Sequence, residues 1–373
     1  MRRNAADLVS LGALLVALPG LWLAPTMFFA SWLAAWWFCL LTTMGLLSSC
    51  WIHALTGGRW GEALRLVARP LARGVPWLCL AFLPLAAGLH RVFPWAAGTD
   101  WTHQLDVPDF QLAWFAPAFF WTRMALYALL WCLLARPAVF ANRGRVAAAT
   151  FAWVVSGTLA TVDLVVSLLP GWYSTAHGLV NLAGGALGGA ALATAVLARR
   201  VPRAFPTPPP RPAQKRATPL WRDLGNLLLM WNMLWAYVAF VEFLIQWAEN
   251  LPREVQWIVP REAGGWAGVG LALGLLQFGA CFVALLFRAN KDDPRRLAGI
   301  AAALLLGQLL NCAWLVLPSV DPAPALGWWL VPALAVAMGL PVVSRTVRAI
   351  PRDTVIPAPE PAPRPPQGAP AHA

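Results

Sequence analysis

Long apolar segments follow one another along almost the whole chain, separated by short polar connections. A helix needs about 20 apolar residues to cross a hydrocarbon core of about 30 Å. Ten segments have about this length, at residues 8–24, 27–55, 72–90, 111–135, 146–168, 176–198, 223–248, 264–287, 297–317 and 326–343. Their apolar runs are continuous, which favours helices over the alternating strands of a membrane barrel. The pattern therefore predicts an all-α integral membrane protein.

Composition agrees with this prediction, and the positions of the charges orient the chain. Of the 373 residues, 59% are hydrophobic and only 12% are charged, against about 25% charged in soluble domains. If the N-terminus is cytoplasmic, nearly all basic residues fall on inner connections, for example Arg59, Arg143 and Arg295, whereas acids such as Asp106 and Glu254 fall outside. The positive-inside rule then places both termini in the cytoplasm. It also explains the net charge of +12 without a nucleic-acid partner.

The pattern divides the chain into one membrane domain and a tail. Residues 1–348 form the polytopic domain, which contains a basic, proline-rich cytoplasmic loop at 199–221. Residues 349–373 are proline-rich and hydrophilic, so we expect a disordered cytoplasmic tail. The first segment could pass for a signal peptide, but a second apolar segment follows almost at once, and we interpret the first as a retained helix.

Three ionisable residues stand inside the predicted spans, namely Arg123, Asp163 and Glu242. Asp163 shares a helical face with Ser156 and Ser167, seven residues before it and four after it. An ionisable group is costly in hydrocarbon and usually faces protein or water. Arg123 needs a carboxylate partner, and we expect both acids to share it. Two interpretations stay open: a static buried ion pair, or a proton relay in which a carboxylate changes charge.

Three histidines lie near the ends of predicted spans. His53 lies at an inner end, where it is either a polar helix-end group or a proton carrier. His90 and His177 lie at outer ends, on the same side of the membrane as Asp163, and are candidate proton-linked polar groups. A bis-histidine haem needs two ligands at one depth facing each other; only His90 and His177 could do so, and their place at span ends disfavours a b-type haem.

The other potential ligands show no recognised spacing. The six cysteines form no CxxC or CxxCH motif, so we predict no zinc, iron–sulfur or covalent haem site in this chain. We expect them to be small packing residues. The outer loop carries His103 with Asp100, Asp106 and Asp109, but no fixed helical spacing aligns them, and metal binding is not predicted there.

Five sequence blocks, taken together, resemble a known family. They occur in order between residues 26 and 318 and read His53-Ala-Leu-Thr-Gly-Gly-Arg-Trp-Gly61, Phe82-Leu-Pro-Leu-Ala-Ala-Gly-Leu-His90, Val162-Asp-Leu-Val-Val-Ser-Leu-Leu-Pro-Gly-Trp-Tyr-Ser174, Asp223-Leu-Gly-Asn226 and Asn250-Leu-Pro-Arg-Glu254. As a set they resemble the NrfD/PsrC-like superfamily. The resemblance is greatest to the ActF-type membrane subunit of alternative complex III, a quinol:cytochrome c oxidoreductase.

The resemblance implies a fold of two four-helix bundles, from spans two to five and six to nine, with flanking helices. It also implies a subunit of a quinol oxidoreductase complex in the bacterial inner membrane, which is not catalytic by itself and anchors the complex, with proton relay as a further role. This chain would bind no cofactor. The implied partners are a larger NrfD-like membrane subunit with the quinol, an iron–sulfur/molybdopterin-like subunit, and haem c subunits.

The chain departs from the family pattern at the turn after span five. That turn usually reads Ser-Leu-Glu-Pro-His-Trp-Tyr-Ser, whereas Leu169 and Gly171 stand here in place of the acid and the histidine. Two protonatable groups are therefore missing. A quinone-binding subunit of a molybdopterin-type oxidoreductase is the alternative function, since related subunits bind quinone. It would need a polar pair lining an apolar slot at the outer face, and His90, Asp163 and His177 are the candidates for it. A transporter or a b-type cytochrome is less favoured, because no span has the character of a half-helix broken at mid-membrane.

Overall fold

The computed structural model describes residues 5–98, 101, 108–201, 220–249, 251–322, 328–352 and 354. These residues form helices and no strands. Ten helical stretches among them are long and apolar enough to cross a membrane: Ala5–Leu23, Pro25–Thr56, Val75–Val92, Pro117–Leu134, Arg143–Leu168, His177–Arg200, Leu220–Glu249, Trp266–Leu286, Pro294–Val320 and Leu330–Ala349. Each coincides with one predicted segment, so the predicted all-α membrane fold is confirmed. Most of the proline-rich loop and tail, and His103 with Asp100 and Asp106, lie outside the described residues.

Several spans consist of more than one helix. In chain order the elements are α1 (Ala5–Ala17), α2 (Gly20–Leu23), α3 (Pro25–Thr56), α4 (Trp60–Ala72), α5 (Val75–Leu80), η1 (Leu83–Gly88), α6 (Leu89–Val92), η2 (Pro94–Ala96), α7 (Pro108–Trp114), α8 (Pro117–Leu134), η4 (Pro137–Ala141), α9 (Arg143–Leu164), η5 (Val166–Leu168), α10 (His177–Arg200), α11 (Leu220–Glu249), η6 (Val255–Trp257), α12 (Val259–Glu262), α13 (Trp266–Gly274), η7 (Leu275–Phe282), α14 (Val283–Leu286), α15 (Arg288–Asp292), α16 (Pro294–Val320) and α17 (Leu330–Ala349).

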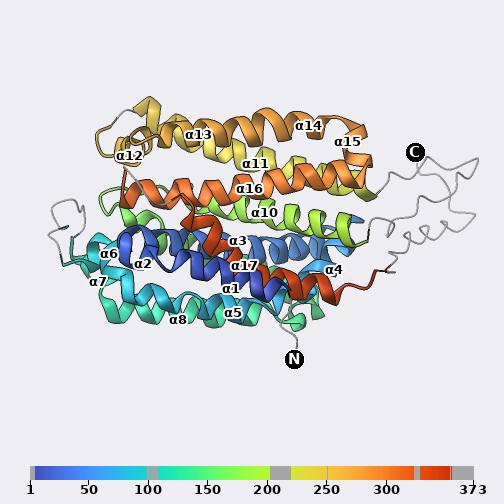
Figure 1. The fold of residues 1–373 in the computed structure, drawn as a ribbon, viewed down its shortest axis with the longest axis horizontal. Coiled ribbons are helices and arrows are strands. Elements are labelled where there is room, and N and C mark those ends of the chain that lie inside the picture. Colours follow the sequence, from blue (N-terminus) through green and yellow to red (C-terminus); the bar gives the residue numbers. More distant parts are fainter. Residues whose placement is uncertain are drawn as a thin grey trace, which may run out of the picture.

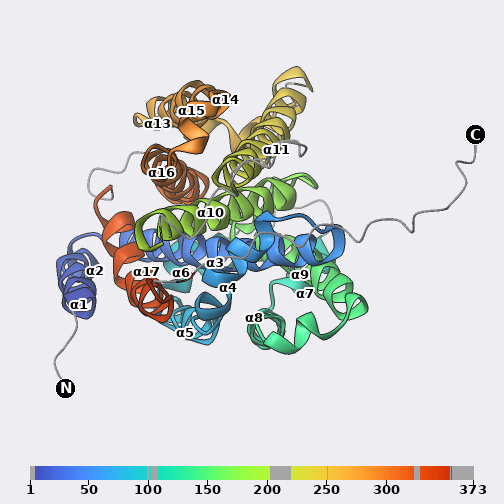
Figure 2. The same ribbon diagram turned by 90° about the vertical axis from the view of Figure 1, so that its right-hand side faces the viewer.

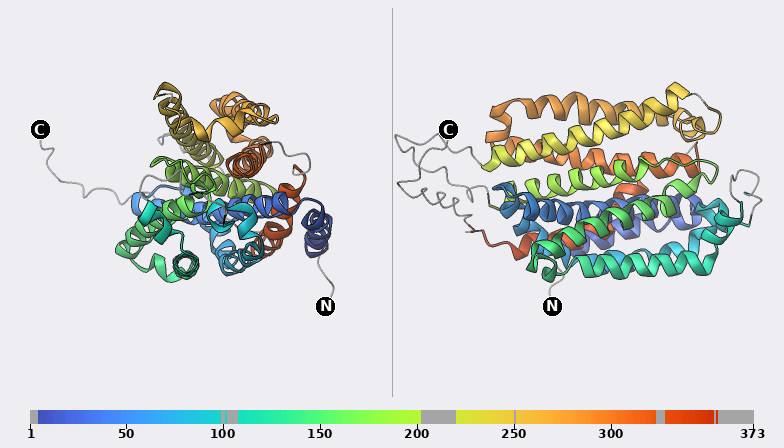
Figure 3. Two further views of the ribbon diagram at one scale, coloured as in Figure 1. Left: turned by 90° about the vertical axis from the view of Figure 1, so that its left-hand side faces the viewer. Right: turned by 180° about the vertical axis from the view of Figure 1, so that it is seen from behind.

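The spans are arranged as two groups of four that meet at α3 and α10 (Figures 1 and 2). One group contains α3, the α5–α6 span, α8 and α9. The other contains α10, α11, the α13–α14 span and α16, and the view from behind separates the same two groups (Figure 3). Helices α1 and α17 pack on each other, and α17 also packs on α3. This is the arrangement of two bundles with flanking helices that the resemblance implies.

Glycines allow α3 and α10 to approach closely at the centre. A Cβ on Gly45 of α3 would lie 2.1 Å from the backbone carbonyl of Gly185, and one on Gly189 would lie 2.3 Å from the backbone nitrogen of Leu46. Backbone atoms cannot move aside as a flexible side chain does, so any larger residue would separate the helices. The glycine spacing in α10 predicts such contact; the matching Gly45 on α3 is visible only in the structure.

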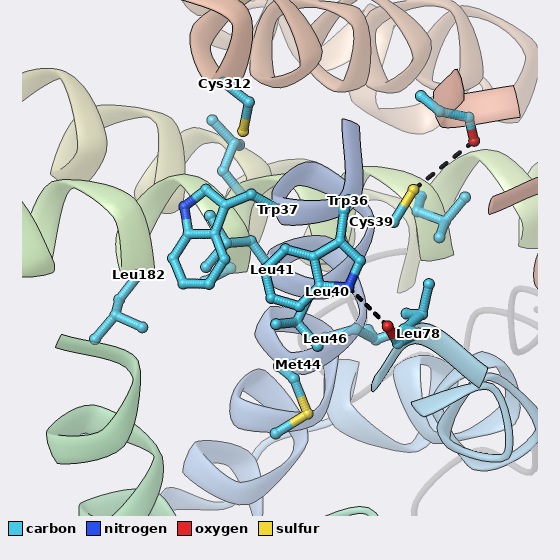
Figure 4. Close-up of a cluster of buried hydrophobic side chains, with 14 of the residues drawn as sticks. Trp36, Trp37, Cys39, Leu40, Leu41, Met44, Leu46, Leu78, Leu182 and Cys312 are labelled. Atoms are coloured by element: carbon cyan, nitrogen blue, oxygen red, sulfur yellow. Dashed lines mark hydrogen bonds between the residues drawn. The ribbon is translucent and has the colours of Figure 1, made fainter. Parts of the chain in front are cut away.

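The span after α4 is irregular, and tryptophans of α3 compensate for this. Pro84 in η1 has no N–H to donate, and the local 3₁₀ bonding frees the carbonyls of Leu78 and Ala81. The Trp36 indole donates to the Leu78 carbonyl at 2.7 Å (Figure 4). The Trp32 indole donates to the Ala81 carbonyl at 2.9 Å. These tryptophans therefore bind backbone inside the protein, where a free carbonyl would otherwise be costly.

One end of the molecule carries the arginine-rich connections, and we call it the basic end. Helices α3, α10 and α17 finish there, and α4, α9, α11 and α16 begin there. Gly57, with a positive φ of 82°, follows the last residue of α3 and ends that helix. Arg222 pairs with Asp292 of α15 at 2.5 Å, and Lys291 donates to Asn226 at 2.8 Å. Burial lowers the pKa of Lys291, and the positive charges of Arg222 and Arg288 lower it further.

Candidate functional site

Asp163 is fully buried one residue before the end of α9, in the half of the molecule away from the basic end. Four donors reach its two carboxylate oxygens. Oδ1 accepts from the Trp114 indole at 2.7 Å and from Nη2 of Arg123 at 3.0 Å. Oδ2 accepts from Nε of Arg123 at 3.1 Å and from the Tyr127 hydroxyl at 3.0 Å. Because a carboxylate offers about four lone-pair sites, its hydrogen-bonding capacity is filled by protein.

A break between α7 and α8 shapes the arginine side of this pair. Pro117 starts α8 and disfavours a helical conformation at the residue before it. The break leaves the carbonyl of Trp114 free, and Nη1 of Arg123 donates to it at 2.7 Å. The guanidinium also lies 4.1 Å from the ring centroid of Trp114 and 4.5 Å from that of Phe119. Arg123 is thus held by a bidentate carboxylate, one carbonyl and two aromatic faces.

A line of aromatic side chains continues from this ion pair toward the basic end. Tyr127 stacks on Trp131, with ring centroids 5.7 Å apart. The Trp131 indole donates to the Ser156 hydroxyl at 3.1 Å. The predicted polar face of span five is therefore buried. Its Ser156 side chain, however, contacts Trp131 of α8 and not Asp163. Ser167 lies beyond α9 in η5, and its hydroxyl donates to the backbone carbonyl of Asp163 at 2.6 Å.

Glu242 belongs to a second, separate cluster at the start of α10. Its Oε2 lies 3.1 Å from Nδ1 of His177, and the Ser174 hydroxyl donates to Oε1. The Nε2 of His177 is buried without a hydrogen-bond partner among the described residues. The Asn181 amide, one turn further along α10, donates to the His177 carbonyl at 3.0 Å and accepts from the Trp37 indole at 2.9 Å. This carboxylate therefore has a titratable partner, which Asp163 lacks.

Two tryptophans and a buried arginine complete the second cluster. The indoles of Trp172 and Trp257 stack with centroids 4.3 Å apart, and both meet the His177 ring edge-on. The Arg261 guanidinium lies 3.3 Å from the Trp257 ring centroid and donates to the carbonyls of Trp257 and Leu315, both at 2.6 Å. These contacts hold the connection between α11 and α13 against α16.

The charge on Arg261 acts on this cluster from outside the membrane spans. Burial lowers the pKa of its guanidinium well below the usual value, and the negative charge of Glu242 opposes that shift. A guanidinium stays protonated in proteins, so Arg261 remains a cation beside the carboxylate. The electrostatic partner of Glu242 on the arginine side is therefore Arg261, not Arg123.

The structure thus corrects one expectation from the sequence. Arg123 and Asp163 form the predicted buried ion pair, but Glu242 does not share Arg123 and pairs with His177 instead. The difference arises because α8 and α9 pack together in one bundle, whereas α10 and α11 pack in the other. Similar depth in the membrane did not bring the two carboxylates to one arginine.

The other two histidines among the described residues, His53 and His90, lie away from both clusters. His90 is exposed on α6 and is not joined with Asp163 or His177. His53 is buried at the basic end, where Nε2 lies 2.9 Å from the Gly58 carbonyl and the ring packs against Trp60. A Cβ on Gly61 would collide with the His53 ring at 1.9 Å. The first resemblance block therefore packs against itself at a helix end.

A third polar cluster, without charged groups, lies between α11, η7 and α16. The Gln308 amide donates to Oε1 of Gln277 at 2.7 Å, and the Asn232 amide donates to the Gln277 backbone carbonyl at 2.9 Å. Oδ1 of Asn232 and Nε2 of Gln277 have no partner among the described residues. Gln277 stands in a π-helix, a geometry that is frequent at functional sites; the apolar sequence around it gave no sign of this.

Among the residues that the structure describes, no three His, Cys, Asp or Glu side chains gather as a metal site would require. All six cysteines are free thiols. Comparison of the chain with protein-family models and with curated proteins gives no match. The resemblance to the NrfD/PsrC-like superfamily therefore stays a prediction from the sequence blocks.

Several contributing residues were not singled out from the sequence. Tyr127 lies four residues after Arg123 and so shares its helical face, a signal that was available. Trp114 and Trp257 carried no such signal, because their roles depend on the break at Pro117 and on the fold of a connection. Arg261 lies in the connection between two predicted spans, and nothing in its spacing indicates burial.

Proposed function

We propose that the chain is a non-catalytic membrane subunit of a respiratory quinol:electron-acceptor oxidoreductase of the alternative complex III kind, and that it anchors the complex in the bacterial inner membrane. The proposed partners are a larger NrfD-like membrane subunit, an iron–sulfur/molybdopterin-like subunit and haem c subunits. We assign a local proton-exchange role, within this proposal, to Glu242 and His177 only.

The anchoring role is supported by the contacts that the Val162–Ser174 stretch makes inside the protein. This stretch carries much of the resemblance. Asp163 at its start is saturated by four protein donors, and Ser174 at its end donates to Glu242. Trp172 between them stacks on Trp257. The stretch therefore joins the two bundles through internal contacts. The carboxylate of Asp163 holds helices together and is not open to other partners.

The same geometry limits the proton role. All four acceptor sites of the Asp163 carboxylate are occupied by protein donors, so Asp163 has no free site for a proton donor and is a poor carrier. Glu242 has a histidine partner, and histidine is the side chain that changes charge near neutral pH. However, the next buried polar residue of α11 toward the basic end, Asn232, is ten residues from Glu242, or about 15 Å along the helix. Side chains alone do not bridge that distance.

The test uses the complex isolated through an affinity tag on this chain from the native membrane. We expect the proposed partners to be recovered with it, and Asp163→Asn to reduce their recovery strongly, whereas the exposed Asp109→Asn does not. Glu242→Gln should keep assembly and quinol oxidation but lower proton uptake in proteoliposomes, with Glu249→Gln as the matched control on α11. Recovery of the chain without any redox partner would overturn the anchoring role.

The orphaned Nε2 of His177 favours one second candidate, a quinone-binding subunit of a molybdopterin-type oxidoreductase. A buried ring nitrogen beside two indoles is suited to a quinone carbonyl oxygen. A photoreactive quinone analogue added to the isolated complex should then label this chain near His177. Labelling confined to the larger membrane subunit would remove this candidate and leave the anchoring role unaffected.

A further inference from the structure

A cavity of about 390 Å³ lies between α3, α16 and α17, in a region that neither polar cluster uses. Cys39 and Thr43 of α3 line it, and Cys39 is labelled near Trp36 in Figure 4. Ala302 of α16 and Gly339 of α17 line opposite walls, and Leu192 of α10 closes it toward the second bundle. We call this cavity the α16–α17 cleft.

The lining of the α16–α17 cleft is almost entirely apolar. The Thr43 hydroxyl donates to the Cys39 carbonyl at 2.8 Å, and the Cys39 thiol lies 3.8 Å from the Ala335 carbonyl. Thr42 contributes the one other polar side chain among the lining residues. A ligand with several hydrogen-bonding groups would leave them unmatched here, at a cost for each. The interior is therefore suited to a hydrocarbon chain.

The cleft opens toward the hydrocarbon region. Helices α16 and α17 each pack on α3 but touch each other little. Leu306 on α16 and Val336 on α17, which stand at its mouth, are 52% and 38% exposed.

Two arginines mark the basic end of the cleft. Arg199 follows Leu192 by seven residues on α10, and Arg295 precedes Ala302 by seven residues on α16. Seven residues are nearly two helical turns, so each arginine lies below its lining residue on the same face, about 10 Å nearer the basic end. Both side chains are exposed, at the depth where the headgroup of a lipid seated in the cleft would lie.

The arginines of α17 are placed differently. Arg345 lies two residues after Val343, a lining residue, and Arg348 lies five after it, so both point to the other side of the helix. Arg348 also donates to Ser344 on its own helix. The basic end therefore offers the cleft one specific pair of cations, Arg199 and Arg295, and a second pair that serves as an internal control.

We propose that the α16–α17 cleft binds an acyl chain of an anionic phospholipid, whose phosphate is held by Arg199 and Arg295. An apolar slot below paired basic residues at a membrane surface matches the two parts of such a lipid. The site does not depend on the proposed membership of an oxidoreductase complex, because every contact belongs to this chain and the bilayer.

The test is native mass spectrometry of the full chain purified from its native membrane, with identification of the bound lipid. Val336→Trp blocks the mouth of the cleft, and Val283→Trp makes the same change at a lipid-facing position on α14 that is 45% exposed. The arginine pair is tested by Arg199→Gln with Arg295→Gln, and its control is Arg345→Gln with Arg348→Gln. Gel filtration and circular dichroism check that every variant is folded.

We expect one anionic phospholipid per chain in the wild type and in both controls. Val336→Trp should abolish it, and the Arg199/Arg295 variant should bind phosphatidylglycerol in phosphatidylcholine discs about 30-fold more weakly, since each basic residue near the surface contributes about five-fold. Recovery of an isoprenoid quinone instead of a phospholipid would overturn the proposal. Equal retention of the lipid in Val336→Trp would also overturn it. A wild-type chain that holds no lipid, together with a Val336→Trp variant that loses a partner subunit, would overturn it as well, because the cleft would then bind a protein.

Discussion

The two buried carboxylates lie in the same half of the membrane and differ in their surroundings. Asp163 is 0% exposed and Glu242 is 9% exposed. Asp163 is bound by a permanent cation, two indole or phenol donors and nothing that titrates near neutral pH. Glu242 is bound by a histidine and a serine, with Arg261 behind an indole. Depth alone therefore does not decide whether an intramembrane acid is structural.

What decides it is the chemistry of the partner. Arg123 binds both carboxylate oxygens of Asp163, and two further donors fill the remaining acceptor sites. Glu242 meets an imidazole and a hydroxyl, and one ring nitrogen of that imidazole has no partner among the described residues. The first cluster joins α8 to α9, and the second joins α10 to α11. The comparison predicts large structural effects in the first cluster and smaller effects in the second.

The largest effect is expected from Asp163→Ala, because it leaves Arg123 buried without its counterion. We expect a loss of about 3–5 kcal/mol in the free energy of unfolding. Chemical unfolding of the purified protein in detergent measures it. Asp109→Ala, on the exposed surface of α7, should leave the unfolding curve unchanged.

The double variant Arg123→Met with Asp163→Leu sharpens this result. Removing both charges leaves no buried ion unpaired, so the double variant should be more stable than Asp163→Ala alone. A double variant that unfolds as easily as the sum of the two single changes would mean that Asp163 does more than balance Arg123.

The next effect is expected from Arg261→Gln, in the other cluster. This change removes donors to the carbonyls of Trp257 and Leu315 and the cation above the Trp257 ring. We expect a loss of about 2–3 kcal/mol in unfolding free energy, measured by the same unfolding curves. Arg91→Gln, an exposed arginine at the same end, serves as the control, and equal effects of the two changes would contradict the assigned contacts.

A smaller effect on stability is expected from Glu242→Gln. Glutamine still accepts from Ser174, so the loss should be about 1–2 kcal/mol in unfolding free energy. His177→Gln should alter the tryptophan fluorescence of the folded protein, because Trp172 and Trp257 contact the His177 ring. Tyr127→Phe, in the other cluster, should leave that fluorescence unchanged. An unchanged spectrum in His177→Gln would contradict these ring contacts.

The smallest effect is expected from Tyr127→Phe, which removes one of the four donors to Asp163. Arg123 and Trp114 still satisfy both oxygens, so the expected loss is about 1 kcal/mol. Tyr237→Phe, whose side chain is 65% exposed on α11, is the matched control and should be silent in the same unfolding measurement. A loss as large as that of Asp163→Ala would mean that the hydroxyl, not the arginine, governs the cluster.

The sequence by itself determined the number and approximate bounds of the ten spans, because apolar length is a local property and the bilayer sets its scale. It also located Asp163, Arg123 and Glu242, since a charged residue in such a run stands out at once. The glycines of α10 predicted a close helix contact in the same way. The side of the membrane at which the basic end lies rests on the charge pattern alone and stays a prediction.

Only the tertiary structure decided which charges meet. Judged by depth in the membrane alone, Arg123 could pair with either carboxylate. Helix packing places Asp163 beside Arg123 and Glu242 beside His177. The break at Pro117 turned the Trp114 carbonyl and indole toward that pair, and an arginine from a connection became buried beneath α16. Such contacts join residues tens of positions apart, so no periodicity within one helix records them. The α16–α17 cleft likewise exists only because two helices that both pack on α3 stand apart from each other.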